Sequence, residues 1–184
     1  MDRRVLVPRS PIGNLINEKF QPWVPVPPNS ILDLCTGSGC IGISCAYAFP
    51  GSKITISDIS EDALIVASKN VINHKCSGQI QIFESDLFGE LGDERYDLIV
   101  STLAYVVAED YRSMPEAYLA DHALGLIAGD DGLYIVRKIL CEAVDYLHEG
   151  GSLIVEVGNS AAALEQAYPD LPFLWVDFIE GDSG

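Results

Sequence analysis

Apolar runs alternate with helical stretches along most of this chain of 184 residues. Four short apolar runs predict buried strands, at 30–35, 53–58, 79–86 and 96–101. Two segments of helical composition lie between the first three of these runs, at 40–49 and 60–72. Ser60 precedes the second segment as a candidate N-cap, and two acids in its first turn suit the helix dipole. Strands that alternate with helices predict an α/β fold with a mostly parallel sheet and helices on both faces.

The same alternation resumes after an irregular region at 102–130. Here one helical stripe of apolar residues predicts a helix that ends at Gly150-Gly151; its members are Leu133, Val136, Leu140, Ala143, Val144 and Leu147. A strand at 152–158, a short helix at 160–168 and a last strand at 172–178 are expected to follow. No internal repeat interrupts this order.

The first 28 residues have a different character. The Pro-rich QPWVPVPPNS excludes a central strand or a long helix. Ser10 and Pro11 are suited to begin a short helix, as its N-cap and first-turn proline. We therefore divide the chain into a lead-in segment, 1–28, and one main domain, 29–184, against which the lead-in packs.

Charge and composition limit the partners. The net charge of −16 favours solubility or attraction to a basic partner, and it argues against binding to a phosphate backbone. No apolar run approaches the roughly 20 residues that span a bilayer, and no apolar segment follows the basic start. We expect a cytoplasmic protein. Its five cysteines, without Cys-x-x-Cys spacing, are expected to be reduced rather than disulfide-bonded or metal-bound.

The strongest local motif is ILDLCTGSGCIGI at 31–43, where a strand meets a Gly-rich turn and a helix begins. Gly37 and Gly39 permit a positive φ and a close ligand approach, and the helix start supplies unpaired N–H groups. Together with Gly42 they also fit the dinucleotide pattern Gly-x-Gly-x-x-Gly, which is weak when it stands alone. Asp33, just before the turn, disfavours a pyrophosphate and favours a ligand ammonium.

Two further acids lie at the ends of neighbouring predicted strands. Asp58, about 20 residues after Gly37, is placed to accept hydrogen bonds from ribose hydroxyls, and Asp86 to accept one from an adenine amine. Each of these acids alone has an ordinary explanation as a strand end or a helix cap. Together with Asp33 they describe a ligand with an ammonium, a ribose and an adenine, which is S-adenosylmethionine.

With these motifs the chain resembles the class I methyltransferases, and more narrowly the protein-glutamine methyltransferases. VLVPRSPIGNLI, ILDLCTGSGCIGI, ISDIS, ESDLF and GLIAGDDGL resemble the branch that acts on a large-subunit ribosomal protein. The release-factor branch has Pro-Glu-Thr after VPR, where this chain has Ser10-Pro11-Ile12. The resemblance implies a Rossmann-like sheet with strand order 3-2-1-4-5 and the last strand at the far edge. It also places Leu87 beside the adenine and requires no metal.

The resemblance gives the segment after the fourth strand a role as the acceptor loop. The family carries Asn-Pro-Pro-Tyr there, and the Asn side chain and the first proline carbonyl accept the two hydrogens of the substrate amide. In this chain Thr102 replaces the Asn, Leu103 and Ala104 replace the prolines, and Tyr105 is retained. Thr102, Leu103 and Tyr105 would form the acceptor site, which the substitutions weaken because two stiffening prolines are lost.

The family also carries a helical domain before VLVPRSP and a final antiparallel strand after the last one here; neither is expected in this chain. The fifth and sixth strands would then have unpaired edges, so we expect 172–178 to be loosely held or to pair with another chain, such as a second copy.

The primary hypothesis is S-adenosylmethionine-dependent methylation of a glutamine amide in a basic ribosomal protein, impaired by the altered loop. Two alternatives stand beside it. The first is a non-catalytic remnant or fragment that binds the cofactor or a partner. The second is methylation of a base amino group in nucleic acid, which uses a similar loop but which the acidic balance disfavours.

Overall fold

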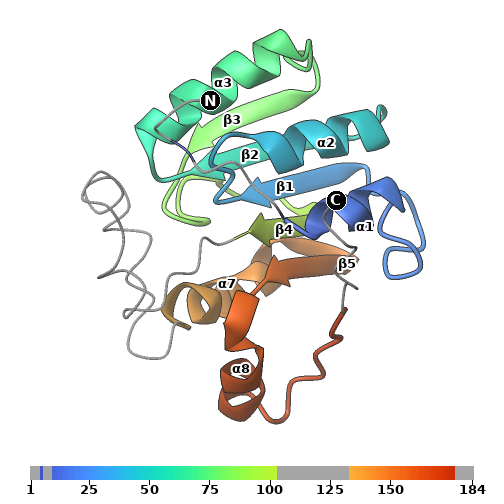
Figure 1. The fold of residues 1–184 in the computed structure, drawn as a ribbon, viewed down its shortest axis with the longest axis vertical. Coiled ribbons are helices and arrows are strands. Elements are labelled where there is room, and N and C mark those ends of the chain that lie inside the picture. Colours follow the sequence, from blue (N-terminus) through green and yellow to red (C-terminus); the bar gives the residue numbers. More distant parts are fainter. Residues whose placement is uncertain (1–4, 6–9, 103–132, 177–184) are drawn as a thin grey trace, which may run out of the picture.

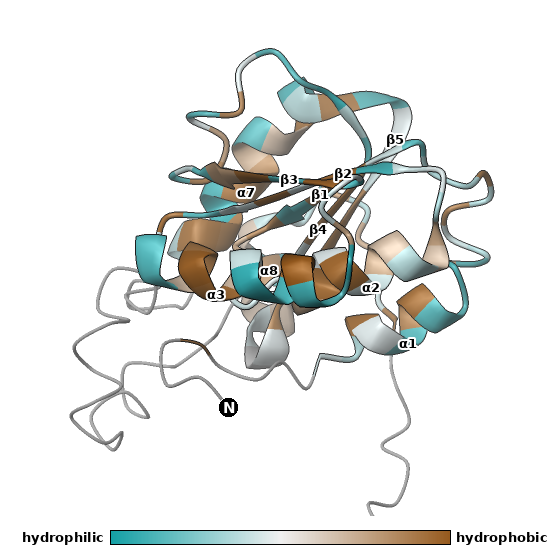
Figure 2. Ribbon diagram, turned by 90° about the horizontal axis from the view of Figure 1, so that it is seen from above, coloured by the Kyte–Doolittle hydropathy of each residue, from teal (hydrophilic) through white to brown (hydrophobic). Residues whose placement is uncertain are grey.

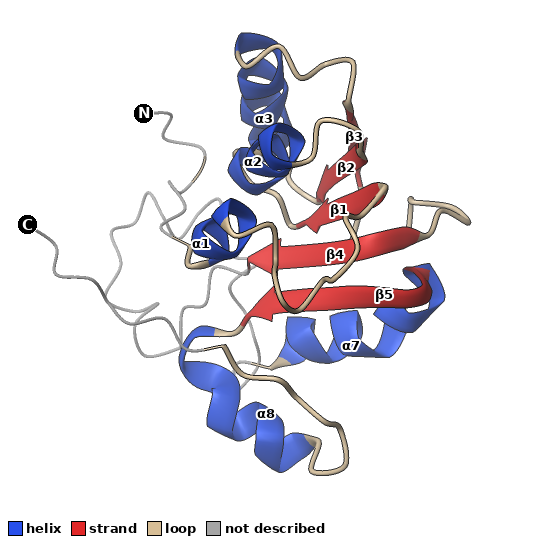
Figure 3. Cartoon of the chain, turned by 90° about the vertical axis from the view of Figure 1, so that its right-hand side faces the viewer, coloured by secondary structure: helices blue, strands red, loops and turns tan. Residues whose placement is uncertain are grey.

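The computed structural model describes residue 5 and residues 10–102 and 133–176. Its centre is a five-stranded sheet in the order β3-β2-β1-β4-β5, as expected, and every pairing is parallel. The strands are β1 (Ser30–Leu34), β2 (Lys53–Asp58), β3 (Ile80–Glu84), β4 (Tyr96–Thr102) and β5 (Leu147–Glu156). The arrowheads of β4 and β5 point the same way in Figure 3.

Three helices cover one face of this sheet: α1 (Ile12–Asn17), α2 (Cys40–Ala48) and α3 (Glu61–Asn73). Their buried residues share one core with Ile31, Ile54 and Leu98 of the strands. Figure 2 shows the three helices together on one side of the strands. The short helix of the lead-in segment thus packs on the same core as the main domain.

The opposite face is covered by α7 (Tyr134–Tyr146) and by the segment after β3. Ile139 and Ala143 of α7 pack there with Leu32 and Ile99 of the strands and with Phe88. Figure 1 shows α7 beside β5, with η1 (Gly158–Ser160) and α8 (Ala161–Ala167) following in the chain. Helices on both faces confirm the α/β class expected from the alternating pattern.

Two sequence-based expectations are wrong in this half of the chain. The helix does not run to Gly150-Gly151, because α7 ends at Tyr146 and β5 begins at Leu147. The ladder between β4 and β5 carries a register shift between Tyr96 and Leu98, and this shift allows the strand to begin early. Val144, placed on the buried stripe, is 69% exposed, and Ile139 lies in the core instead.

The last predicted strand, 172–178, is also wrong where the structure describes it. Residues 172–176 have no strand structure, and 177–178 lie outside the described residues. The indole of Trp175 donates to Glu165 Oε1 of α8 at 2.6 Å, and Phe173 packs beside Leu164. This segment therefore contacts α8 rather than extending the sheet.

Most remaining elements agree with the prediction to within one residue, whereas β3 ends two residues before the predicted end at 86 and β5 ends two residues before the predicted end at 158. The Ser60 hydroxyl accepts from Ala63 N at the start of α3. Pro11 rather than Ser10 is the cap of α1, although Ser10 Oγ accepts from Ile12 N. All five cysteines are free, as expected. Within the described ranges no helix has the length and apolar character needed to cross a membrane.

Candidate functional site

The site lies where the strand order reverses. β1 is flanked by β2 on one side and β4 on the other, so the strands that precede β4 in the chain extend to one side of this point and β4 and β5 to the other. In open α/β sheets such a point forms a crevice beyond the carboxyl ends of the strands. Leu34 at the end of β1 pairs with Ser101 of β4, and the Ser101 hydroxyl donates to the Leu34 carbonyl at 2.9 Å. The Gly-rich turn and the predicted acceptor strand are therefore adjacent.

Backbone conformation explains the glycines of the turn. Gly37 and Gly39 have φ of 55° and 79°, and Gly39 is the N-cap of α2. A Cβ added at Gly37 would meet nothing within 4 Å, so the space beside Gly37 is open, whereas a Cβ at Gly39 would lie 3.2 Å from Ala67 Cβ. Such a turn lets a ligand approach the backbone and the start of a nine-residue helix.

Asp33 organises this turn from below. It is only 1% exposed, and its Oδ2 accepts from the Thr36 hydroxyl at 2.5 Å and from Gly42 N at 2.8 Å. The carboxylate therefore ties β1 to the first turn of α2. The side chain is thus enclosed by the protein, and a ligand over the turn would meet its charge only from beneath the turn.

Burial raises the pKa of the Asp33 carboxyl from 3.8 to about 7, and the nearby charge of Asp58 adds to this effect. The hydrogen bonds from Thr36 and Gly42 oppose it because they favour the charged form. Near neutral pH the carboxyl is thus poised between its two protonation states.

This raised pKa predicts a specific dependence of stability on pH. The folded chain binds the proton more tightly than the unfolded chain, so the contribution is full below about pH 4 and is lost as pH rises through about 7. Asp33→Asn cannot ionise and should gain stability relative to wild type, by about 2–3 kcal/mol more at pH 8 than at pH 5. Urea unfolding of both proteins at the two pH values measures this gain. The same difference at both pH values would contradict the buried carboxyl.

Asp58 joins three turns at the same edge of the sheet. Its Oδ2 accepts from Gly37 N at 2.8 Å, and its Oδ1 accepts from Ser60 N at 3.0 Å. Its backbone carbonyl accepts from Ser85 N at 3.0 Å. The acid that was expected to bind ribose hydroxyls therefore also fixes the turns that surround it.

The segment after β3 carries Asp86 and Leu87, next to Ser85, whose backbone N bonds the Asp58 carbonyl. Asp86 is exposed, and its backbone N donates to Glu90 Oε2 at 2.9 Å. Leu87 is buried and has φ of 52°, a conformation that the Ser85 hydroxyl supports by donating to the Leu87 carbonyl at 2.7 Å. An exposed acid next to a buried apolar side chain suits a ligand with a flat apolar ring and an exocyclic amine.

Cys35 lies at the base of the turn with φ of 60°. Burial raises the pKa of its thiol to about 12, and nearby carboxylates add to the shift. The thiol stays protonated at neutral pH and is a poor nucleophile. Thiolate chemistry is thereby excluded for this side chain.

The predicted acceptor residues are only partly described. Thr102 ends β4, whereas Leu103 and Tyr105 lie outside the described residues. Thr102 Oγ1 is 3.4 Å from Ser10 Oγ, and Ser10 Oγ donates to Glu156 Oε2 at 2.5 Å. Sequence reasoning missed Ser10 and Glu156. The strand-end rule that selected the aspartates would have found Glu156, which ends β5.

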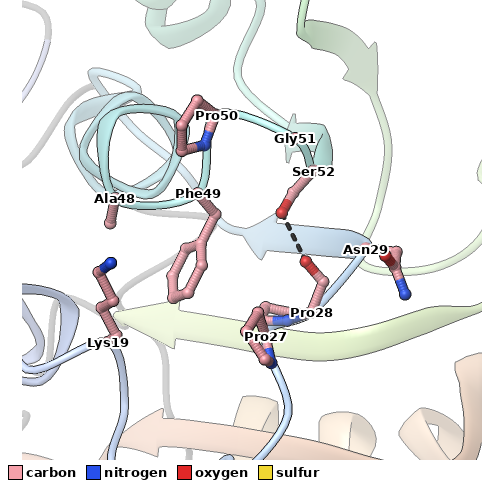
Figure 4. A pocket seen from close by; sticks show the side chains of 9 residues that line it. All are labelled: Lys19, Pro27, Pro28, Asn29, Ala48, Phe49, Pro50, Gly51 and Ser52. Atoms are coloured by element: carbon pink, nitrogen blue, oxygen red, sulfur yellow. Dashed lines mark hydrogen bonds between the residues drawn. The ribbon is translucent and has the colours of Figure 1, made fainter.

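A separate cavity of about 290 Å³ is no part of this site. Its lining comes from the segment before β1 and from the connection between α2 and β2, at the amino ends of the strands (Figure 4). There the Ser52 hydroxyl donates to the Pro28 carbonyl at 2.5 Å, which closes the base of the sheet. This bond supports the fold and lies opposite the Gly-rich turn.

Comparisons with known proteins agree with this geometry. The methyltransferase small domain family matches residues 16–103. The chain is 48% identical over 186 residues to the ribosomal protein uL3 glutamine methyltransferase of Francisella tularensis, which covers 100% of this chain and 59% of that protein. The corresponding protein of Neisseria gonorrhoeae is 43% identical over 184 residues, covering 99% of this chain and 61% of its own length. The chain thus spans about three fifths of the curated relatives it matches.

The fold comparison gives the same class. The structure of the human methyltransferase 10 domain containing protein superimposes with a TM-score of 0.64 at 16% identity, over 92% of this chain and 75% of that chain. At this identity the likeness concerns the fold alone. It confirms the Rossmann-like sheet that the sequence predicts.

Proposed function

We propose that this chain, which is similar to the ribosomal protein uL3 glutamine methyltransferases over about three fifths of their length, methylates a glutamine side-chain amide of uL3 with S-adenosylmethionine. The observation that carries the proposal is the Gly-rich turn at the strand reversal, open at Gly37, with Asp33 in β1, Asp58 at the end of β2 and Asp86 just after β3. S-adenosylmethionine supplies a methyl group that its sulfonium makes electrophilic.

In this proposal, the Gly-rich turn and the neighbouring strand ends each bind a different part of the cofactor. The backbone at Gly37 and Gly39 receives the amino-acid part of the cofactor, over the buried charge of Asp33. Asp58 accepts from the ribose hydroxyls, while Asp86 and Leu87 hold the adenine amine and ring. A fixed set of acceptors on strand ends preorganises the pocket, so that little ordering remains to be done on binding.

The acceptor residues must position a weak nucleophile. An amide nitrogen has a delocalised lone pair, so hydrogen-bond acceptors must turn that lone pair toward the methyl group. Thr102, Leu103 and Tyr105 would surround the amide on the side of β4. Holding reacting groups in place is worth several kcal/mol of barrier, which makes geometry rather than acid–base chemistry the main contribution of this site.

The net charge of −16 suits a basic substrate. A strongly negative protein attracts positively charged partners and repels a phosphate backbone, and this attraction weakens with salt. We therefore propose uL3 as a protein substrate, with no direct contact to nucleic acid.

Two measurements test the function. Calorimetry with S-adenosylmethionine examines the pocket, and mass spectrometry of uL3 after incubation with the chain and cofactor detects a methyl group on glutamine. The Francisella tularensis relative serves as the positive control and identifies the modified glutamine. Cofactor binding without methyl transfer would favour a non-catalytic binding protein, and methyl transfer to RNA instead of uL3 would refute the proposed substrate.

A further inference from the structure

Three side chains from distant parts of the chain meet at the carboxyl ends of β4 and β5. Thr102 and Glu156 are register partners on the two strands, and Ser10 reaches them from the segment before α1. Figure 3 shows α1 beside the arrowheads of β4 and β5. All three side chains are partly buried, so their hydrogen bonds are partly shielded from water.

The proton count of Ser10 sets the direction of these bonds. A serine hydroxyl has one proton and two lone pairs. Ser10 gives its proton to Glu156 Oε2 at 2.5 Å and accepts from Ile12 N at 3.2 Å. In the 3.4 Å contact with Thr102 Oγ1, Ser10 can then only accept, so Thr102 must donate.

Resting on the proposed function, we propose that Glu156 acts through Ser10 as a positioning residue that turns the Thr102 hydroxyl into an acceptor for the substrate amide. With its proton directed at Ser10, the Thr102 oxygen presents lone pairs to an incoming N–H. A freely rotating hydroxyl would spend part of its time as a donor, which an amide nitrogen cannot use productively. The Ser10–Glu156 pair thereby supplies part of what the family's asparagine supplies through its side-chain oxygen.

The 3.4 Å contact is longer than an ordinary O–H···O bond. Hydrogen bonds of this kind are often long in the absence of substrate and shorten in the reactive complex. The hydrogen bond from Ser10 to Glu156, at 2.5 Å, is shorter than the contact with Thr102 and holds the Ser10 side chain in place. Orientation is thus set before the substrate binds.

Kinetics of Ser10→Ala test the proposal. We expect kcat for methyl transfer to uL3 to fall about tenfold, with the affinity for S-adenosylmethionine unchanged and the chain still folded. Glu156→Ala should lower kcat similarly, and Ser10→Thr, which restores a hydroxyl, should recover most of the rate. Ser44→Ala is the matched control, because Ser44 is exposed on α2 and its hydroxyl bonds the Cys40 carbonyl of the same helix.

A double-mutant cycle separates positioning from general structural support. Once Thr102→Val has removed the oriented hydroxyl, adding Ser10→Ala should cost nothing further, whereas independent effects would multiply. An unchanged kcat in Ser10→Ala, multiplying effects in the double variant, or a parallel loss of cofactor affinity would each overturn the proposal.

A binding measurement keeps the test separate from the proposed function. Titration of uL3 and of uL3 with its modified glutamine changed to leucine, both with S-adenosylhomocysteine present, reports recognition of the amide without turnover. Wild type should prefer the glutamine form several-fold, and Ser10→Ala should lose that preference. A preference retained in Ser10→Ala overturns the positioning role alone. A wild type with neither preference nor methyl transfer overturns the proposed function and this inference with it.

Discussion

Asp33→Asn should weaken binding of S-adenosylmethionine about 100-fold at pH 8 while leaving the chain folded. The carboxylate is 1% exposed beneath the Gly-rich turn, over which the proposed function places the ammonium of the cofactor. Removing one member of a buried charge pair costs about 3–5 kcal/mol, which corresponds to a factor of at least about 100 in affinity. Asparagine has nearly the same shape and keeps an oxygen that can accept from Thr36 and Gly42.

The affinity for S-adenosylmethionine should depend on pH in wild type but not in Asp33→Asn. Because the pKa of Asp33 is about 7, wild-type affinity should rise between pH 6 and pH 8 as the carboxylate forms. Calorimetry across this range should show no such rise in Asp33→Asn. Asp93→Asn removes the same charge from an exposed position before β4 and should behave as wild type. If Asp33→Asn bound the cofactor normally, Asp33 would be a support for the turn and nothing more.

Gly42→Ala should lower both stability and cofactor affinity, for a reason of space rather than of backbone conformation. A Cβ at this position would lie 2.4 Å from Ile56 Cγ2 and 3.2 Å from Asp33 Oδ2. Ile56 is fully buried, so neither partner can withdraw without moving α2 away from the sheet. Overpacking of this kind typically costs about 1–3 kcal/mol.

Cofactor affinity should fall with stability in Gly42→Ala, because Gly42 N also donates to Asp33. Urea unfolding and calorimetry measure the two effects. Gly13→Ala is the contrasting control: a Cβ there meets nothing within 4 Å, and alanine in a helix gains about 0.5–1 kcal/mol over glycine. Normal stability in Gly42→Ala would show that α2 is not packed against Ile56 as closely as the distances indicate.

Elements that rest on local pattern were predictable from the sequence. The strands at the Gly-rich turn, the N-cap at Ser60 and the strand order follow from short-range periodicity, capping chemistry and resemblance. Sequence reasoning failed where neighbouring strands decide the structure. The extension of β5 back to Leu147 depends on pairing with Tyr96, which no local pattern encodes. The glycines at 150–151 resemble the end of a helix in the sequence but lie within β5.

The candidate site was also predictable only in the features that local sequence patterns determine. Asp33, Asp58 and Asp86 could be selected because strand ends gather at one edge of a parallel sheet. The hydrogen bonds of each aspartate could not be predicted from the sequence. The bond from the Thr36 hydroxyl to Asp33 and the bond from Gly37 N to Asp58 depend on where the folded chain places the side chains. Ser10 lies 146 positions from Glu156 along the chain, so their contact emerges only from the folded sheet.

Asp58 joins the three turns around the proposed cofactor site through hydrogen bonds. The turns after β1, β2 and β3 each bond one backbone amide to this residue, at Gly37, Ser60 and Ser85. Groups joined through one residue open to solvent as a cooperative unit rather than separately. Occupation of the pocket would consequently slow hydrogen exchange at all three amides in concert, and a disturbance at any one turn would be felt by the other two.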